Sequence, residues 1–144
     1  MSSVLPAPGT ELGDRVRRRL DHELVVWMTT VGGDGTPQPN PVWFIRDPDG
    51  DGVLTYNRAS AARVRHVRER PRVALHFNMR EHDGDVAVLV GTAEIVGDAT
   101  PSDANPPYQA KYRDAIRSLG MDAAGFARTY PVAIRVRFTK VRGL

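Results

Sequence analysis

The sequence predicts a mainly β fold with flanking helices, in which six antiparallel strands close into a small barrel. Short runs of β-branched and aromatic residues recur along the chain, and clusters of Gly, Asp, Asn and Pro separate most of them. The last run, residues 132–141, alternates strictly between apolar and polar side chains, as a half-buried strand does. Strands joined by tight turns pair antiparallel, and six strands with few intervening helices favour closure into a barrel.

The strands are expected at residues 24–31, 39–46, 53–56, 72–79, 86–96 and 132–141. The expected tight turns contain residues that tolerate positive φ, as turns require, and they are Gly32-Gly33-Asp34-Gly35, residues 47–52 and His82-Asp83-Gly84-Asp85. Gly91 interrupts the fifth strand and predicts a bulge or a close backbone approach there.

Helices are expected at both ends of the chain and in its middle. Leu12, Val16 and Leu20 form one apolar stripe of a helix over residues 10–21. Thr100-Pro101 opens a helical region, in which a helix over residues 107–119 ends at Gly120 and Asp122 caps a shorter one to Thr129. We expect residues 1–9 to be a disordered lead-in and residues 10–144 to form a single domain.

Composition narrows the function classes. The 144 residues contain no cysteine, which excludes disulfides, thiolate metal sites and cysteine nucleophiles and is typical of a cytoplasmic protein. No run approaches the roughly 18 apolar residues that span a bilayer, and no signal peptide is evident. The net charge of +3, carried mainly by arginine, suits an anionic partner or reflects genomic base composition.

The segment from Leu54 to Phe77 is the most informative one, because it predicts a strand, an arginine-rich helix from about Ser60, a proline stop and another strand. The N-terminus of a helix carries partial positive charge and favours acids, yet the first charged residue is Arg63 and no acid precedes Glu69. Arg63, His66 and Arg70 are expected together on one flank of this helix. A phosphate bound at the helix start would explain the pattern; a solvated basic helix is the plain alternative.

Two other groups of residues are candidate sites. Pro39 and Pro41 cannot donate to a sheet ladder, so the backbone there and the Gln38 amide could bind a planar heteroaromatic ring, although an ordinary barrel strand explains the same pattern. Trp43 and Phe44 should point to opposite faces. The four histidines lack the spacing of a metal site, and no nucleophile or phosphate-loop motif occurs. A protein without its own reactive groups often uses a bound cofactor.

Several segments together resemble the pyridoxamine-phosphate-oxidase-like split β-barrel proteins, and within them the actinobacterial branch that uses the deazaflavin coenzyme F420. The segments span about residues 12–143 and begin at Val26, Asp34, Pro41, Tyr56, Pro71, Gly91, Ala110 and Arg135. The resemblance implies a split barrel of the FMN-binding type that forms a homodimer with cofactor sites at the subunit interface.

The resemblance also implies which residues bind the cofactor. Pro41, Val42 and Trp43 would lie along its ring, Tyr56 and Asn57 would approach the ribityl chain and phosphate, and the basic residue eight before the helix-ending proline, Arg63, would bind the phosphate. The full expected set is Gln38, Pro41, Val42, Trp43, Tyr56, Asn57, Ala62, Arg63 and His66. The family usually has Lys at the position of Arg63 and often Asn at that of His66.

These observations lead to an F420-dependent oxidoreductase as the first hypothesis, with hydride transfer between the deazaflavin and a small unsaturated or heteroaromatic substrate. Arg65, Arg68 and Arg70 would attract the acidic tail of F420. The alternatives are an FMN-binding oxidoreductase of the same fold, a cofactor carrier without enzymatic activity and, less favoured, a nucleic-acid-binding protein. The catalytic acid and the physiological substrate are not assigned, and Tyr108, Tyr112 or solvent are the candidate proton sources.

Overall fold

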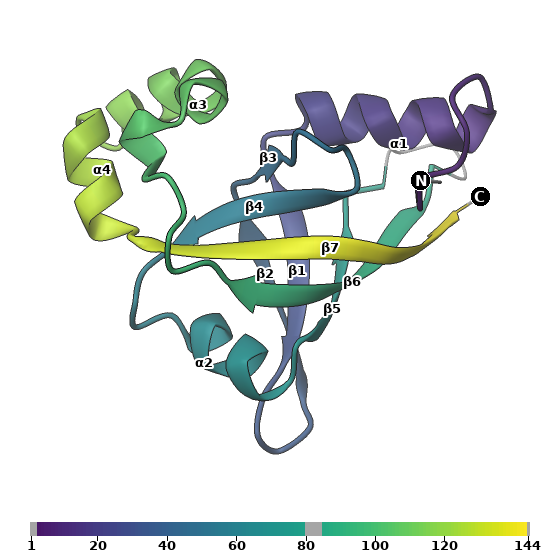
Figure 1. The fold of residues 1–144 in the computed structure, drawn as a ribbon, viewed down its shortest axis with the longest axis horizontal. Coiled ribbons are helices and arrows are strands. Elements are labelled where there is room, and N and C mark those ends of the chain that lie inside the picture. The colour runs from purple at the N-terminus through teal and green to yellow at the C-terminus, as the bar shows by residue number, and fades with distance from the viewer. Residues whose placement is uncertain (1–2, 80–84, 144) are drawn as a thin grey trace.

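A computed structural model describes residues 3–79 and 85–143 of the chain, shown in Figure 1. The strands of this part form one sheet and are β1 (Val26–Val31), β2 (Pro37–Val42), β3 (Ile45–Arg46), β4 (Gly52–Asn57), β5 (Arg72–His76), β6 (Ala87–Ile95) and β7 (Val132–Gly143). The helices are α1 (Glu11–His22), α2 (Ala62–Glu69), α3 (Pro106–Ser118) and α4 (Ala123–Thr129), with a 3₁₀ turn, η1 (Ser102–Ala104), before α3.

The described strands are seven rather than the six expected, because the segment predicted as one strand over residues 39–46 is divided. Its first part, β2, pairs with β1, and its last part, β3, pairs with β4. The strand order is β2-β1-β5-β6-β7-β4-β3, with every pair antiparallel, so β2 and β3 are opposite edges of the sheet. Three Cα steps join Val42 to Ile45 and span at most roughly 11 Å. The sheet must therefore curl until its two edges approach, which produces an incompletely closed barrel.

The other elements follow the sequence closely. Thr10 caps α1, Asn105 and Asp122 cap α3 and α4, and Gly120 follows α3 with a φ of +76°. The register of the β6–β7 pair shifts between Val90 and Gly91, where a Cβ on the glycine would lie 2.4 Å from the Arg137 carbonyl oxygen.

Two further expectations concern a turn and the N-terminal segment. The turn expected at His82-Asp83-Gly84-Asp85 lies mostly outside the described residues. Residues 3–9, expected to be a disordered lead-in, lie against the domain: Leu5 is buried in the core, and the Ser3 hydroxyl donates to Asp51 at 2.6 Å.

The core has two parts, and β4 separates them. One fills the barrel with side chains from the strands, α1 and α2, including Val16, Met28 and Phe44. The other packs α3 and α4 on the outer face of β4, around Tyr56, Tyr108, Tyr112 and Phe126. All six residues of β4 are buried as a result, since each face of the strand is covered. Figure 1 shows α3 and α4 together at one end of the molecule and α1 at the other. Within the described ranges, no helix combines the length and apolar character needed to cross a membrane.

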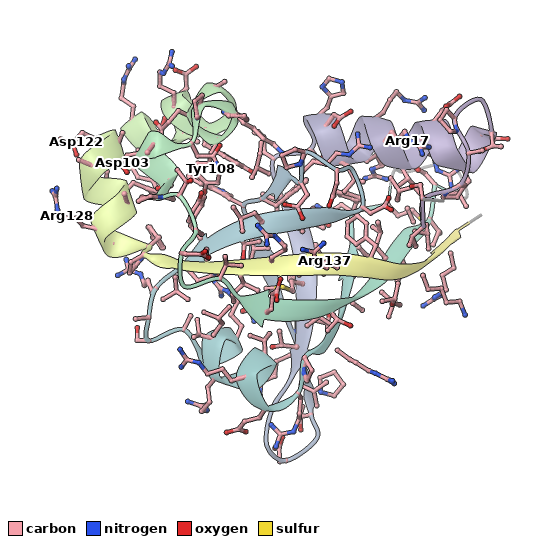
Figure 2. The ribbon with its side chains drawn as sticks, viewed as in Figure 1. Arg17, Asp103, Tyr108, Asp122, Arg128 and Arg137 are labelled. Atoms are coloured by element: carbon pink, nitrogen blue, oxygen red, sulfur yellow. The ribbon has the colours of Figure 1, made fainter. Side chains whose placement is uncertain are left out.

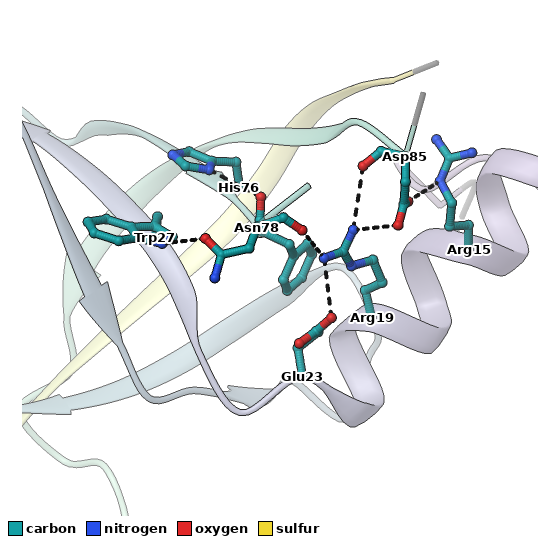
Figure 3. Close-up of polar contacts among 8 residues, drawn as sticks. Arg15, Arg19, Glu23, Trp27, His76, Asn78 and Asp85 are labelled. Carbon is teal, nitrogen blue, oxygen red and sulfur yellow. Dashed lines mark hydrogen bonds and ion pairs between the residues drawn. The ribbon is translucent and has the colours of Figure 1, made fainter. Parts of the chain in front are cut away.

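A buried guanidinium group attaches α1 to the barrel (Figure 3). Arg19 is 5% exposed and donates to Asp85 at 2.8 Å and to the carbonyl oxygen of Asn78. Its second terminal nitrogen lies 3.2 Å from Glu23, and the group stands over the ring of Phe77. Arg19 therefore holds the end of β5 and the approach to β6 against the same helix.

Replacing Arg19 with leucine should lower the free energy of unfolding by about 2 kcal/mol, because the change removes one of the two arginines that pair with the buried Asp85 carboxylate and the side-chain donor to the Asn78 carbonyl oxygen, while Arg15 still lies 2.9 Å from Asp85. Urea denaturation at pH 7 measures this. Arg18→Leu, at an exposed position one residue earlier, is the control and should stay within about 0.5 kcal/mol of wild type. Equal losses in the two variants would contradict the role of Arg19.

Candidate functional site

The segment that joins the two sheet edges, Trp43-Phe44, is held by a tyrosine of α3. Phe44 is fully buried in the barrel, and its backbone N–H donates to the Tyr112 hydroxyl at 2.8 Å. The same hydroxyl lies 2.9 Å from the Phe44 carbonyl oxygen and 2.7 Å from that of Leu24. Burial raises the pKa of the Tyr112 phenol, so the group stays protonated and can both accept and donate.

Trp43 points the other way, as expected for neighbouring residues on opposite faces. Its ring is half-buried and stacks on Tyr112 at 4.7 Å and on Phe126 at 5.5 Å between centroids. The α3–α4 layer therefore fixes the orientation of the indole.

Lys111 is the second residue of α3 that contacts this segment. Its ammonium group donates to the Phe44 carbonyl oxygen at 3.0 Å and stands 3.7 Å from the centroid of the Phe44 ring. Burial lowers the pKa of Lys111 to about 8, although the carboxylates of Asp21 and Glu23 act in the opposite direction.

Asn57 and Arg63 form the polar part of the site. Asn57 is completely buried at the end of β4, and its amide nitrogen donates to Thr55 and to the Val132 carbonyl oxygen. Its amide oxygen accepts from Nε of Arg63 at 2.6 Å, which fixes the orientation of the guanidinium and leaves its two terminal nitrogens for another acceptor.

Arg63 is a half-buried cation at the start of α2. Burial lowers its pKa, and no described carboxylate lies within ion-pair distance of it. Helix α2 begins at Ala62, slightly later than expected, with no side-chain cap and no acid in its first turn. A desolvated guanidinium beside an uncapped helix start favours an anionic ligand.

A cavity of about 180 Å³ lies beside Arg63, between β2, β4 and the α3–α4 layer. Five of the nine residues expected from sequence line it: Pro41, Val42, Trp43, Tyr56 and Arg63. The remaining walls are Tyr108, Leu119, Phe126 and Tyr130. The described chain thus brings an aromatic wall and a cation together, as a planar ligand with a phosphate requires.

Tyr108 supplies a polar group of this wall that has no protein partner. Its side chain is fully buried between α3 and the sheet (Figure 2), and its hydroxyl makes no hydrogen bond with the described residues. Burial raises its pKa, so the phenol is neutral. A buried hydroxyl without a partner costs about 1–3 kcal/mol, and a ligand acceptor in the cavity would offset that.

The other expected residues lie elsewhere. His66, expected beside Arg63 and Arg70 on one flank of the helix, does not line the cavity: it is buried with Val64 and Val67, and its Nδ1 lies 2.8 Å from the Thr30 hydroxyl. The reason is that α2 packs on β1 and β6, which covers that flank.

Gln38 approaches His66 instead of the cavity. A Cβ built on Gly32 would lie 2.9 Å from the Gln38 amide nitrogen and 3.4 Å from His66 Nε2, so both side chains converge on this glycine. Ala62 is exposed in the first turn of α2. Asn57 does not line the cavity either, and its link to the cavity is the hydrogen bond that its amide oxygen accepts from Arg63.

Three lining residues were not expected from the sequence: Leu119, Phe126 and Tyr130. They come from the end of α3 and from α4, far along the chain from β2 and β4, and no local pattern shows which strand face these helices cover.

Comparison with known proteins shows the family of the chain. The profile of the family described as pyridoxamine 5'-phosphate oxidase matches residues 12–144. The chain belongs to this family. The match covers every strand and helix described above except the first residue of α1. Among curated proteins, none matches the sequence.

Solved structures share the fold of this family member at low identity. The conserved hypothetical protein Rv2991 from Mycobacterium tuberculosis is 14% identical with a TM-score of 0.73, over 99% of this chain and 87% of the other. An F420 reductase is 24% identical with a TM-score of 0.65, over 88% and 94%. HutZ, a heme storage protein from Vibrio cholerae, is 12% identical with a TM-score of 0.62, over 93% and 95%.

The lowered pKa of Lys111 makes stability depend on pH. Between about pH 8 and 10.5 the unfolded chain retains a proton that the folded chain has lost, so the free energy of unfolding rises with pH in this window. Relative to Lys111→Met, which lacks the titrating group, wild type should gain on the order of 1 kcal/mol after solvent screening is allowed for.

Urea denaturation at pH 7.5, 8.5 and 9.5 measures this gain. Lys140→Met, at an exposed position on β7, is the control and should keep the wild-type dependence. A wild-type curve parallel to that of Lys111→Met would contradict the assignment.

Proposed function

We propose that this protein is an oxidoreductase that binds coenzyme F420 through its phosphate at Arg63 and catalyses hydride transfer to or from a small unsaturated or heteroaromatic substrate. The observation that carries the proposal is the half-buried Arg63 guanidinium. It is oriented by Asn57, has no described carboxylate partner and faces an aromatic cavity at an uncapped helix start. These features fit a ligand that joins a phosphate to a planar ring.

Each part of the site has a role in this proposal. Arg63 and the first turn of α2 bind the phosphate, while Pro41, Val42 and Trp43 lie along the ring. Trp43 is held by its stacking on Tyr112 and Phe126, so the ring meets a rigid surface. When bound, the deazaflavin supplies the hydride chemistry. The chain positions it, excludes water with the α3–α4 aromatics and offers the Tyr108 hydroxyl as a hydrogen-bond donor.

F420 is favoured over FMN by charge. Its acidic tail adds carboxylates beyond the phosphate, and Arg65 and Arg68 are exposed along α2 beyond Arg63. Arg70, in contrast, lies 2.9 Å from Glu69 and is partly neutralised. The likeness to an F420 reductase supports the same choice, and FMN remains the alternative.

We propose further that the site is completed by a second copy of the chain. The cavity of about 180 Å³ is smaller than the roughly 300 Å³ of the smallest common ligand pockets. The outer face of β1, β2 and β5 beside it presents half-buried Trp27 and His76 and exposed Pro39 and Pro41. A dimer through this face would cover these side chains, and light scattering at micromolar concentration tests for it.

Fluorescence titration of the purified protein with F420 tests the phosphate assignment. Wild type should bind in the micromolar range or tighter, and Arg63→Ala should weaken binding about 10- to 100-fold, because it removes a charge-assisted interaction with the phosphate. Arg63→Lys keeps the charge and should recover part of the affinity.

Arg113→Ala, an exposed arginine of α3, is the control and should bind as wild type does. Tight F420 binding that is indifferent to Arg63→Ala would overturn the phosphate site. Parallel titrations with FMN, haemin and duplex DNA decide between ligand classes: FMN binding alone selects the flavin alternative, and haemin or DNA binding alone contradicts the proposal.

A further inference from the structure

A second cavity, which we call the α4 cavity, lies between α4 and the connection from β6 to η1. Its volume of about 350 Å³ is within the usual range for small-molecule sites, and residues of one chain line it. Tyr56 and Tyr130 separate it from the cavity beside Arg63, since both residues line both cavities. Nothing in the proposed cofactor chemistry uses this second space.

The α4 cavity is open because small residues line it. Alanines from α4 and β7 form much of its wall, and a Cβ built on Gly97 would meet nothing within 4 Å. Gly97 has no positive φ, so its backbone does not require glycine. The backbone at position 97 would therefore accept a larger residue, and the space beside it exists because glycine has no side chain.

A buried hydroxyl among the lining residues has no partner. Ser102 is 1% exposed, and its Oγ makes no hydrogen bond with any described residue. Such a group is expected to pair with something that the cavity contains, because an unpaired buried hydroxyl is destabilising.

Opposite charges flank the cavity. Asp103 and Arg128 both line it, both are exposed, and neither forms an ion pair with a described residue. Figure 2 shows Asp103 at the 3₁₀ turn and Arg128 on the adjacent helix. Asp103 is close enough to Tyr56 that, after burial, its charge contributes to raising the pKa of that phenol.

We propose that the α4 cavity binds a small zwitterion of the amino-acid class, with the ligand ammonium at Asp103, its carboxylate at Arg128 and a polar atom hydrogen-bonded to Ser102. The apolar wall accommodates the ligand's side chain. A ligand with a single charge would leave one of the two rim groups unpaired. The site is independent of the cofactor site beside Arg63.

Three probes with the same aromatic body test the charge requirement: L-phenylalanine, phenethylamine and 3-phenylpropanoate. In ¹H–¹⁵N NMR titrations of the full chain, L-phenylalanine should bind with millimolar affinity and each singly charged probe about two- to fivefold more weakly. Asp103→Asn should weaken L-phenylalanine without affecting 3-phenylpropanoate, and Arg128→Gln should weaken L-phenylalanine without affecting phenethylamine.

Three further variants separate binding from folding. Gly97→Leu adds a large side chain at a lining residue where a Cβ meets nothing within 4 Å, and it should weaken L-phenylalanine at least tenfold, whereas Ala110→Leu, an enlargement at an exposed position of α3, should not. Ser102→Ala should weaken binding yet unfold at the wild-type temperature or above, since its hydroxyl makes no hydrogen bond with the part of the chain that the structure describes. Thermal unfolding of Ser102→Ala and of wild type measures the two melting temperatures.

Failure of all three probes to bind would overturn the proposal, as would unchanged binding by Gly97→Leu or equal affinity for all three probes. F420 titration of Gly97→Leu separates this result from the proposed function, because the cofactor should still bind.

Discussion

The structure depends on the burial of one peptide segment that belongs to no strand. Phe44 lies between β2 and β3, inside the barrel, and its N–H and C=O cannot join either ladder. Unpaired backbone groups are costly in such a place. Tyr112 and Lys111 supply the missing partners from α3. The crossing between sheet edges is therefore possible only because α3 packs on the outside of β4, and the barrel and its helical layer stabilise each other.

The same crossing creates the gap where the site lies. Because β2 and β3 are joined by two residues but never pair with each other, the barrel stays open beside Trp43. The end of β4 and the start of α2 face this gap, and Asn57 directs the Arg63 guanidinium toward it. A partly desolvated cation with no carboxylate partner among the described residues is unfavourable in the free protein. Its persistence is understandable if the gap is where an anion binds, since the ligand then restores the missing interaction.

Much of this could be predicted from the sequence, and the exceptions have physical causes. Turns, caps and the alternation of β7 are local, so Gly50, Gly120 and Asp122 are found where their chemistry requires. The division of the strand at Trp43 was missed because β-propensity continues through it, and only tertiary pairing ends β2. The burial of His66 against Thr30 could not be predicted, because a helical wheel shows neighbours within a helix but not which side chains a sheet covers. The walls from α3 and α4 required the long-range packing itself.

Tyr56 shows how one side chain can keep two kinds of chemistry apart. Its ring packs edge-on against Tyr108, while its hydroxyl donates to the Thr100 carbonyl oxygen and accepts from the Asn105 amide. The phenol is thus fixed between β4 and the connection that precedes α3. On one side of it the described charge is that of Arg63, and on the other side Asp103 and Arg128 both line the α4 cavity. A side chain held by two hydrogen bonds and an edge-on ring contact therefore keeps the cavity beside Arg63 separate from the α4 cavity, which has both signs of charge at its wall, so the two proposed ligands would not compete for the same space.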